Sequence, residues 1–323
     1  MINLTESTLR TRREFLKSSS ILLGAAAVSS ALPPTLFAQD DSARIEQIRK
    51  QISGPIQVNK VSGNVYMLMG AGGNIGILTG TEGKFVVDSG VVSSAAGVLQ
   101  ALAQLDAQPL KYLINTHFHF DHTEGNAKLH EAGATIVARD KTRQRLSTPQ
   151  YVDALQLHFP AAPAMALPTR TLNNAFTFYH QGEEVQLQSL PPAHTDTDLF
   201  VYFTSADVLQ AGDVFFNGFY PLIDYSSGGS ASGYVDGMAK MLVVAKDSTK
   251  VIPGHGPLGS KADLTAAHDM LATVRDRVAA AKASGKTVEE TVASKPSAEF
   301  DATFGKGLLG PDAFVAILYK SLP

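Results

Sequence analysis

The stretch that decides the fold is LKYLINTHFHFDH, residues 110–122. Its first five residues, apolar except for Lys111, predict a buried strand, and a run rich in histidine and aspartate follows directly. In extended backbone, alternate side chains share a face, so His117, His119 and Asp121 converge while the two phenylalanines between them pack inward. His122 breaks the alternation and can face a neighbouring point. The segment therefore predicts nitrogen and oxygen donors for two adjacent metal ions at the end of a strand.

Three later residues follow predicted strands at the points where these run into loops: His194, Asp213 and His255. Alone, each such residue is more often a solvated loop residue than a ligand, but together with residues 117–122 they supply the missing donors. The chain has no cysteine, so every metal ligand must be nitrogen or oxygen. Neutral imidazole and carboxylate are the ligands that zinc accepts under that restriction.

The elements around these motifs alternate between strand and helix, which predicts an α/β architecture. The predicted strands are 61–69, 74–78, 84–87, 110–114, 134–138, 175–179, 184–190, 199–204, 208–211 and 250–253. The predicted helices are 42–53, 93–105, 124–131, 232–245, 261–282, 288–294 and 311–320. Residues 151–171 carry three prolines and little periodicity, which is typical of a surface loop or active-site lid.

The order His117-x-His119-x-Asp121-His122, then His194, Asp213 and His255, resembles the metal motifs of the metallo-β-lactamase superfamily, over essentially the whole chain after residue 38. The implied fold is a four-layer αβ/βα sandwich of two mixed sheets with outer helices. Asp88, in Val87-Asp88-Ser89-Gly90, resembles the family's buried structural aspartate beneath the metal loop.

The resemblance also implies roles for the donors and a reaction. His117, His119 and His194 would hold one zinc ion, and Asp121, His122 and His255 the other. Asp213 would bridge the two ions. A hydroxide held between the ions would attack the substrate, because zinc lowers the pKa of bound water to about 7. Asp121 would be the catalytic residue that orients this hydroxide and passes a proton to the leaving group.

The expected activity is cleavage of a carboxylic ester, thioester, lactone or lactam. Many β-lactam-cleaving members carry Cys or Ser at the position of Asp213, whereas members similar to glyoxalase II and to lactonases carry Asp, which favours the non-lactam bonds. A β-lactamase stays the first alternative. An oxidoreductase similar to the persulfide dioxygenases, with a single iron, is the alternative from another class. Two zinc ions per chain are expected, and iron and manganese stay open.

The first residues predict an export signal. Thr11-Arg12-Arg13-Glu14-Phe15-Leu16-Lys17 and the Ala/Ser-rich run after it resemble a twin-arginine signal, which gives residues 1–38 as the signal peptide and 39–323 as a single domain. The expected location is periplasmic or otherwise exported, without stable membrane insertion after cleavage. With 27 Lys and Arg against 30 Asp and Glu, nucleic acid is not an expected partner. A small-molecule substrate is the expected partner. The oligomeric state stays open.

Several segments and residues allow two interpretations from the sequence alone. Residues 214–229, rich in aromatics, predict either a wall for the substrate or a cover for the core. Residues 67–73 predict either a mobile flap or a tight glycine turn. Asp196 and Asp198 are candidates for supporting His194 by hydrogen bonding. Four further histidines are interpreted as surface or packing residues: His130, His158, His180 and His268.

Overall fold

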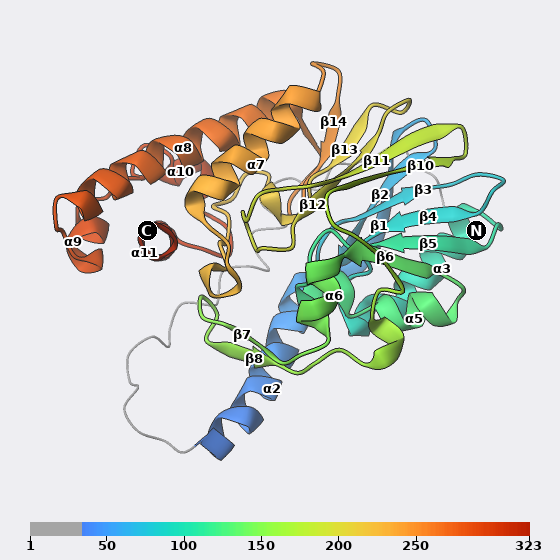
Figure 1. The fold of residues 1–323 in the computed structure, drawn as a ribbon, viewed down its shortest axis with the longest axis horizontal. Coiled ribbons are helices and arrows are strands. Elements are labelled where there is room, and N and C mark those ends of the chain that lie inside the picture. The colour runs from blue at the N-terminus through green and yellow to red at the C-terminus, as the bar shows by residue number, and fades with distance from the viewer. Residues whose placement is uncertain (1–33) are drawn as a thin grey trace.

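Two mixed β-sheets pack face to face in the computed structural model, which describes residues 34–323, with side chains from residue 41 onward (Figure 1). The first sheet has seven strands in the order β1 (Ser53–Ser62), β2 (Val65–Ala71), β3 (Ile75–Leu78), β4 (Lys84–Val87), β5 (Leu110–Ile114), β6 (Thr135–Arg139) and β9 (Arg170–Leu172). The second has six, in the order β10 (Ala175–His180), β11 (Glu183–Ser189), β12 (Leu199–Phe203), β13 (Val208–Gln210), β14 (Lys250–Ile252) and β15 (Gly259–Ser260). A separate hairpin pairs β7 (Gln150–Val152) with β8 (Leu157–Phe159).

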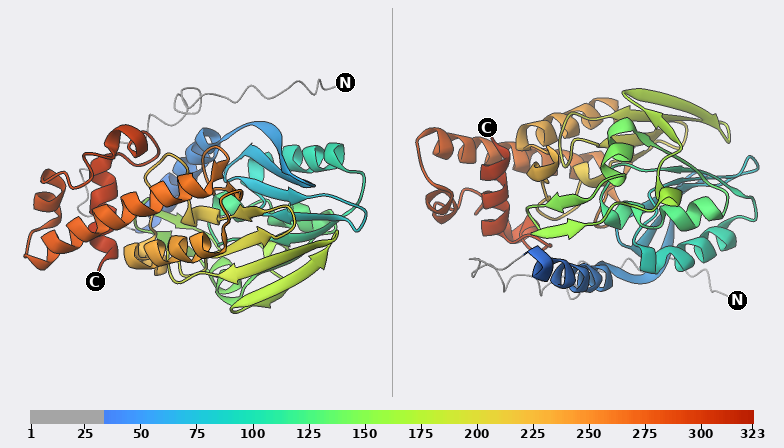
Figure 2. Two further views of the ribbon diagram at one scale, coloured as in Figure 1. Left: turned by 90° about the horizontal axis from the view of Figure 1, so that it is seen from above. Right: turned by 60° about the horizontal axis from the view of Figure 1, so that its bottom comes forward.

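Helices cover the outer face of each sheet. The helices are α2 (Pro34–Ile52), α3 (Ala95–Leu105), α4 (Phe120–Thr123), α5 (Asn126–Glu131), α6 (Asp140–Leu146), α7 (Ala231–Val244), α8 (Lys261–Ala283), α9 (Val288–Ala293), α10 (Asp301–Phe304) and α11 (Pro311–Ser321). The two views of Figure 2 show α7 and α8 on the side of the second sheet and α3 and α5 on the side of the first. This is the predicted four-layer αβ/βα sandwich.

Three apolar cores hold the layers together. The middle core lies between the sheets and joins alternate residues of β2, β4 and β5 to residues of β11, β12 and β13. The outer cores pack α3 and α5 on the first sheet and α7, α8 and α11 on the second. β12 is buried on both faces, and its sequence is a continuous apolar run, whereas β5 carries an exposed Lys111. The predicted metal ligands lie in loops at the same edge of the two sheets.

Several element boundaries differ from the predictions. The single strand predicted over 61–69 is two strands, because the backbone turns at Gly63 with a φ of 53°. The segment 151–171 is irregular only in part, since it begins within the β7–β8 hairpin, contains β8 and ends in β9. The helix predicted over 42–53 already begins at Pro34. Short elements without their own periodicity, such as α6 and β15, were not predicted.

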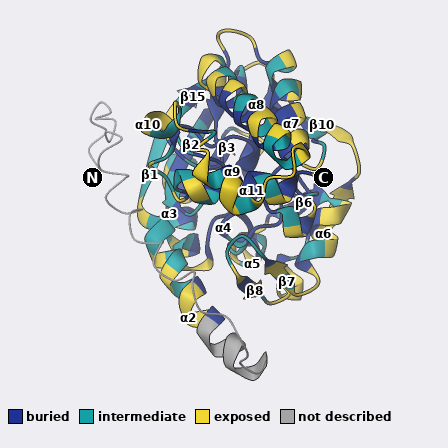
Figure 3. Cartoon of the chain, turned by 90° about the vertical axis from the view of Figure 1, so that its left-hand side faces the viewer, coloured by how far each residue is buried: buried dark blue, intermediate teal, exposed yellow. Residues whose placement is uncertain are grey.

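The predicted export signal lies almost wholly outside the described residues, which begin at residue 34. The division into a signal and a single domain at residue 38 therefore stays a prediction. Residues 34–38 form the start of α2, whose exposed and half-buried faces are visible in Figure 3 for the part with described side chains. Within residues 34–323, none of the helices is both long and apolar enough to cross a membrane.

Candidate metal centre

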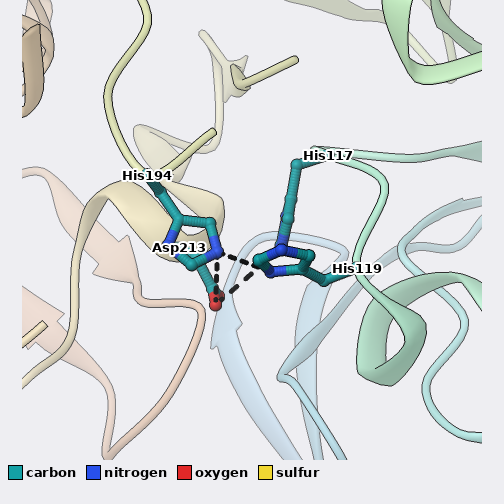
Figure 4. A group of neighbouring side chains, drawn as sticks. All are labelled: His117, His119, His194 and Asp213. Carbon is teal, nitrogen blue, oxygen red and sulfur yellow. Dashed lines mark hydrogen bonds and ion pairs between the residues drawn. The ribbon is translucent and has the colours of Figure 1, made fainter. Parts of the chain in front are cut away.

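The seven predicted donors form two adjacent groups at one end of the sandwich. The first group contains His117, His119, His194 and Asp213, and the second contains Asp121, His122 and His255. Within each group the ligand atoms all lie within 4.8 Å of one another, as metal ligands around one ion must. Figure 4 shows the first group, with the three rings and the Asp213 carboxylate directed at one point. Six of the seven are buried, and His255 is partly exposed.

Each ring of the first group is oriented through the nitrogen that faces away from the centre. His119 Nε2 donates to Asp224 Oδ2 at 3.1 Å, and His194 Nδ1 donates to the Leu222 carbonyl at 2.7 Å. These bonds leave His119 Nδ1 and His194 Nε2, which lie 2.8 Å apart, with their lone pairs facing the centre. Outer hydrogen bonds of this kind fix the tautomer of metal-binding histidines.

Asp88 orients one ring of each group. Its Oδ2 accepts a hydrogen bond from His122 Nδ1 at 2.8 Å and another from the Thr116 hydroxyl at 2.8 Å, and that hydroxyl lies 3.0 Å from His117 Nδ1. Since Thr116 donates to Asp88, its oxygen accepts the proton of His117 Nδ1. Asp88 is buried at 1% exposure and has a φ of 67°. It lies beneath the metal loop, as the resemblance implied.

Asp213 contacts donors of both groups. Its Oδ1 lies 3.0 Å from His122 Nε2, and its Oδ2 lies 3.4 Å from both His194 Nε2 and His255 Nε2. The side chain comes from the turn that follows β13, where the Gly212 backbone has a φ of 53°. The carboxylate is therefore placed between the two groups, as expected for a bridging ligand.

The electrostatics of the second group call for a positive ion. Burial opposes charge on His255, yet Asp213 and Asp121 raise its pKa to about 9, and the same carboxylates raise the pKa of His122 well above its ordinary value. Burial also disfavours the charged form of Asp213, but His122, His255 and His117 hold its pKa well below the usual range. Two buried carboxylates thus require compensating positive charge, which a divalent cation supplies as well as protons do.

The first group suits neutral imidazole ligands. Burial lowers the pKa of His117 well below its ordinary value, and burial lowers that of His194 to about 4. His117 Nε2 is buried and has no hydrogen-bond partner among the described residues. A buried acceptor without a partner is costly, and an ion held by the three histidines would satisfy it. The donor set therefore fits two metal ions with nitrogen and oxygen ligands.

One local prediction was wrong. Residues 117–121 do not form a single extended segment, because α4 begins at Phe120 and places Asp121 and His122 on a helical turn. The turn directs both side chains at the second group, which strict alternation could not do. Phe118 is buried as predicted, but Phe120 is only half-buried and stacks on Phe159 of the β7–β8 hairpin, with ring centroids 4.9 Å apart.

The structure supports His194 differently from the prediction. Neither Asp196 nor Asp198 bonds to its ring: Asp196 pairs with Lys141 and Arg145, and Asp198 accepts from the Thr195 backbone and hydroxyl. Besides Asp88, the aspartate that bonds to a ring of the centre is Asp224, which contacts His119 and was not predicted. Asp224 is fully buried, and the His119 ring and nearby serine hydroxyls lower its pKa despite burial.

Contacts in the structure decide between the two interpretations of residues 67–73 and of residues 214–229. Gly73 donates its backbone N–H to the Asp121 carbonyl at 3.0 Å, and Asn74 Nδ2 donates to the Pro253 and Gly256 carbonyls at 2.9 Å. The 67–73 segment therefore ends in a tight turn packed on both metal loops. In the 214–229 segment, Phe215 and Phe216 both belong to the core on the second sheet, and Phe216 also stacks on the His255 ring, with ring centroids 5.0 Å apart.

The remaining histidines lie outside the centre. His158 bonds to Asp41 at 2.9 Å, His180 bonds to the Gly83 carbonyl at 2.9 Å, and His130 bonds to the Ala134 carbonyl at 2.7 Å. His268 contacts Asp269 on the exposed side of α8. None of the four is within the two donor groups, which agrees with their interpretation as surface or packing residues.

Comparison with known proteins places this centre in a family. Residues 69–259 match the family described as the metallo-beta-lactamase superfamily. The chain therefore belongs to the metallo-β-lactamase superfamily, and it is a metal-dependent hydrolase of that family with a His/Asp metal-binding cluster.

Solved structures share the fold at low sequence identity. A metallo-beta-lactamase from Pontibacter korlensis aligns with a TM-score of 0.56 and 18% identity over 67% of this chain and 99% of its own. The DIM-1 metallo-beta-lactamase aligns with a TM-score of 0.55 and 18% identity over 68% and 98%. The stereoselective inverting sec-alkylsulfatase Pisa1 from Pseudomonas sp. aligns with a TM-score of 0.62 and 16% identity over 82% of this chain but 50% of its own.

Proposed function

We propose that this chain is a dinuclear zinc hydrolase that cleaves a carboxylic ester, thioester or lactone. The observation that carries the proposal is the position of Asp213, whose two carboxylate oxygens contact histidines of both donor groups. One ion would be held by His117, His119 and His194, and the other by Asp121, His122 and His255. Zinc would supply an activated water at neutral pH and polarise the scissile carbonyl.

Asp121 is the proposed catalytic residue among the donors. Its side chain is 11% exposed, its Oδ2 lies 3.1 Å from His255 Nε2, and it lines the cleft above the centre. A carboxylate at this edge can orient the attacking water, accept its proton at Oδ2 and return that proton to the leaving group. Phe216, stacked on His255, excludes water from one side of the same position.

The second donor group separates this proposal from a mononuclear iron oxygenase. Asp121, His122 and His255 are all present, close together and oriented, so a second ion has a complete ligand set. Cleavage of β-lactams is the alternative hydrolytic activity, since two of the similar structures are named metallo-beta-lactamases. Asp213 favours the non-lactam substrates, by resemblance to glyoxalase II-like and lactonase-like members.

A substrate panel combined with metal analysis tests the proposal. Protein purified without chelator is analysed for zinc, iron and manganese by mass spectrometry, then assayed on p-nitrophenyl acetate, a thioester, a lactone and nitrocefin. We expect two zinc ions per chain, and turnover of an ester, thioester or lactone that is lost on chelation and restored by zinc. One iron per chain with oxygen uptake on a persulfide, or turnover of nitrocefin alone, would contradict the proposal.

We also propose that residues 1–38 direct export through the twin-arginine route. The paired Arg12 and Arg13 before a weakly apolar run support this proposal. The double substitution Arg12→Lys and Arg13→Lys keeps the charge and should retain the protein in the cytoplasm, as should a host strain that lacks the translocase. Unchanged export in both would show that the segment acts in another way.

A further inference from the structure

A cleft lies directly above the candidate metal centre, and segments outside the matched family region form much of its wall. Its volume is about 2910 Å³, and it is lined by His119, Asp121, Asp213 and His255 at its floor. Drug-sized ligands occupy pockets of roughly 300–1,000 Å³, so this cleft is large for a small substrate. Helix α2 and residues 302–320 line it, yet the family match covers only residues 69–259.

The C-terminal wall reaches the metal centre through Phe219. A Cβ on Gly256, the residue after His255, would lie 3.2 Å from Phe219 Cε2, and one on Gly307 would lie 2.7 Å from Phe219 Cδ1. The ring is therefore packed between the metal loop and the C-terminal segment. Next to it, Tyr220 stacks on Phe314 of α11 with centroids 4.1 Å apart. Leu308, in the same C-terminal segment as Gly307, lines the cleft and is 38% exposed.

The opposite wall is also fixed to the metal loop. Phe120, next to Asp121, stacks on Phe159 of β8, and Asp41 of α2 bonds to both the backbone and the ring of His158. Figure 3 shows α4, the turn that carries Asp121, with α11 on one side and the β7–β8 hairpin and α2 on the other. The cleft is thus bounded by two walls that each contact a residue beside a metal ligand.

The charged side chains that line the cleft neutralise one another. Arg49 pairs with Glu124 at 2.5 Å, Arg145 with Asp196 at 3.0 Å, and Lys320 with Asp153 at 3.6 Å. Lys60 and Lys306 make no ion pair among residues 41–323, but they are single exposed lysines on different segments. Recognition of phosphate or polycarboxylate groups uses clustered Arg and Lys, which this lining does not offer. Most of the remaining lining is apolar.

We infer that the cleft binds the long, uncharged apolar chain of an acyl ester, with the ester carbonyl at the metal centre and the chain extending between Leu308 and Phe159. This inference rests on the proposed hydrolase function and names its substrate class. Transfer of an apolar acyl chain from water to such a surface is favourable, and each buried methylene increases the binding affinity roughly fourfold. The size of the cleft accommodates a chain of many carbons.

A chain-length series tests the inference. We expect kcat/KM for p-nitrophenyl esters, used below their aggregation concentration, to rise at least about a hundredfold from acetate to decanoate, since eight methylenes are added. Binding of the fluorescent fatty acid 11-(dansylamino)undecanoate is measured in parallel, because it needs no turnover. We expect saturable binding that decanoate displaces and acetate does not.

Variants test where in the cleft the acyl chain of the substrate binds. Leu308→Asn keeps the side-chain size but makes the wall polar, and it should lower the decanoate-to-acetate ratio of kcat/KM about tenfold. Ala316→Trp, which fills the cleft from α11, should shift the preferred ester to a shorter chain. Val243→Asn is the matched control, because Val243 is 85% exposed on α7 and outside the cleft lining, and the ratio should not change.

The outcomes separate the inference from the function it rests on. Binding of the dansyl fatty acid without hydrolysis of any ester would contradict the proposed function while supporting the apolar-chain site. Hydrolysis of acetate and decanoate at equal kcat/KM, with no fatty acid binding, would overturn the inference and leave the hydrolase proposal standing. A ratio unchanged in both Leu308→Asn and Ala316→Trp would also overturn it.

Discussion

The carboxylate of Asp88 accepts a 2.8 Å hydrogen bond from His122 Nδ1, and through the Thr116 hydroxyl it also orients His117. One buried aspartate thus fixes a histidine of each donor group. The two ligand sets are therefore not independent, although the rings themselves face different points. Burial raises the pKa of Asp88, and His122 and Thr116 oppose this rise. The charged form of the carboxylate therefore depends on these donors.

Asp88→Asn should weaken metal binding at both positions. The amide offers a single acceptor oxygen where the carboxylate accepts from His122, from the Thr116 hydroxyl and from the Thr116 backbone. Loss of such outer support lowers metal affinity about 10- to 100-fold, which chelator competition measures. Asp207→Asn is the control, since Asp207 also has a positive φ, of 56°, but bonds to Tyr202 and Thr249 outside the centre. Equal affinities in the two variants would contradict this role.

The sequence predicted which side chains the structure brings together because most of the information is local. His117 to His122 lie in one short segment after a buried strand. Apolar runs also predicted the two strands that precede Asp213 and His255, and the points at which these strands end. The alternation of strand and helix predicted an α/β architecture, and the four layers were implied by the resemblance to the superfamily. The predicted bounds of β4 and β5 agree with the observed ones because both are short, mostly apolar strands bounded by turn residues.

Other features depend on contacts between residues far apart in the chain. Asp224 lies 105 positions after the ring it supports, in a turn whose sequence shows no period. Phe120 was predicted to pack inward by strand alternation, whereas the α4 turn directs it to Phe159. The walls of the cleft come from α2 and the C-terminal segment, and no local pattern indicates that these two segments face the same metal centre.

Asp224→Ala should weaken the first metal position selectively. Without this acceptor, His119 can move its proton to Nδ1, the nitrogen that faces His194 Nε2, and a protonated nitrogen cannot bind metal. We expect a loss of about 10- to 100-fold in affinity for one of two ions, seen as two separate steps in a chelator titration.

Asp224→Asn provides the matched comparison. The Asn oxygen can still accept from His119 Nε2, so its effect should be smaller than that of Asp224→Ala. Asp224→Ala also loses the capping interaction with the Ser227 backbone, which costs about 1 kcal/mol and should lower its melting temperature, whereas Asn caps about as well as Asp. Identical metal affinities in the two variants would show that Asp224 acts only on stability.

Gly73→Ala should disturb the second donor group. A Cβ at this position would overlap the His122 ring, so either the ring or the turn must move. Overpacking of a buried contact costs about 1–3 kcal/mol, and we expect a lower melting temperature together with loss of one ion. Gly54→Ala is the control, because a Cβ there meets no atom within 4 Å. Retention of both ions in Gly73→Ala would mean that the turn adjusts without the ring.

Asp198 should make stability depend on pH. Burial raises the pKa of Asp198 to about 7, although Thr195 donates to it, whereas an unfolded aspartate titrates near 3.9. A raised folded pKa stabilises the fold below about pH 4, and this contribution is lost as pH rises through about 7. Asp198→Asn should remove that decline, which amounts to at most about 4 kcal/mol. Urea unfolding of both proteins from pH 4 to 8 measures the difference, and parallel curves would contradict it.

Asp213→Ala should empty at least one metal position, because its carboxylate alone contacts histidines of both groups. Its removal also leaves Asp121 as the one carboxylate near both His122 Nε2 and His255 Nε2 among the described residues, so the remaining ion is held by fewer ligands. We expect one zinc ion or fewer per chain and loss of hydrolysis by at least about a hundredfold, equivalent to roughly 2.7 kcal/mol. Asp196→Ala removes a carboxylate that pairs with Arg145 outside the donor groups and should keep both ions. Full two-zinc occupancy in Asp213→Ala would refute the bridging role, and with it the argument that the two groups form one centre.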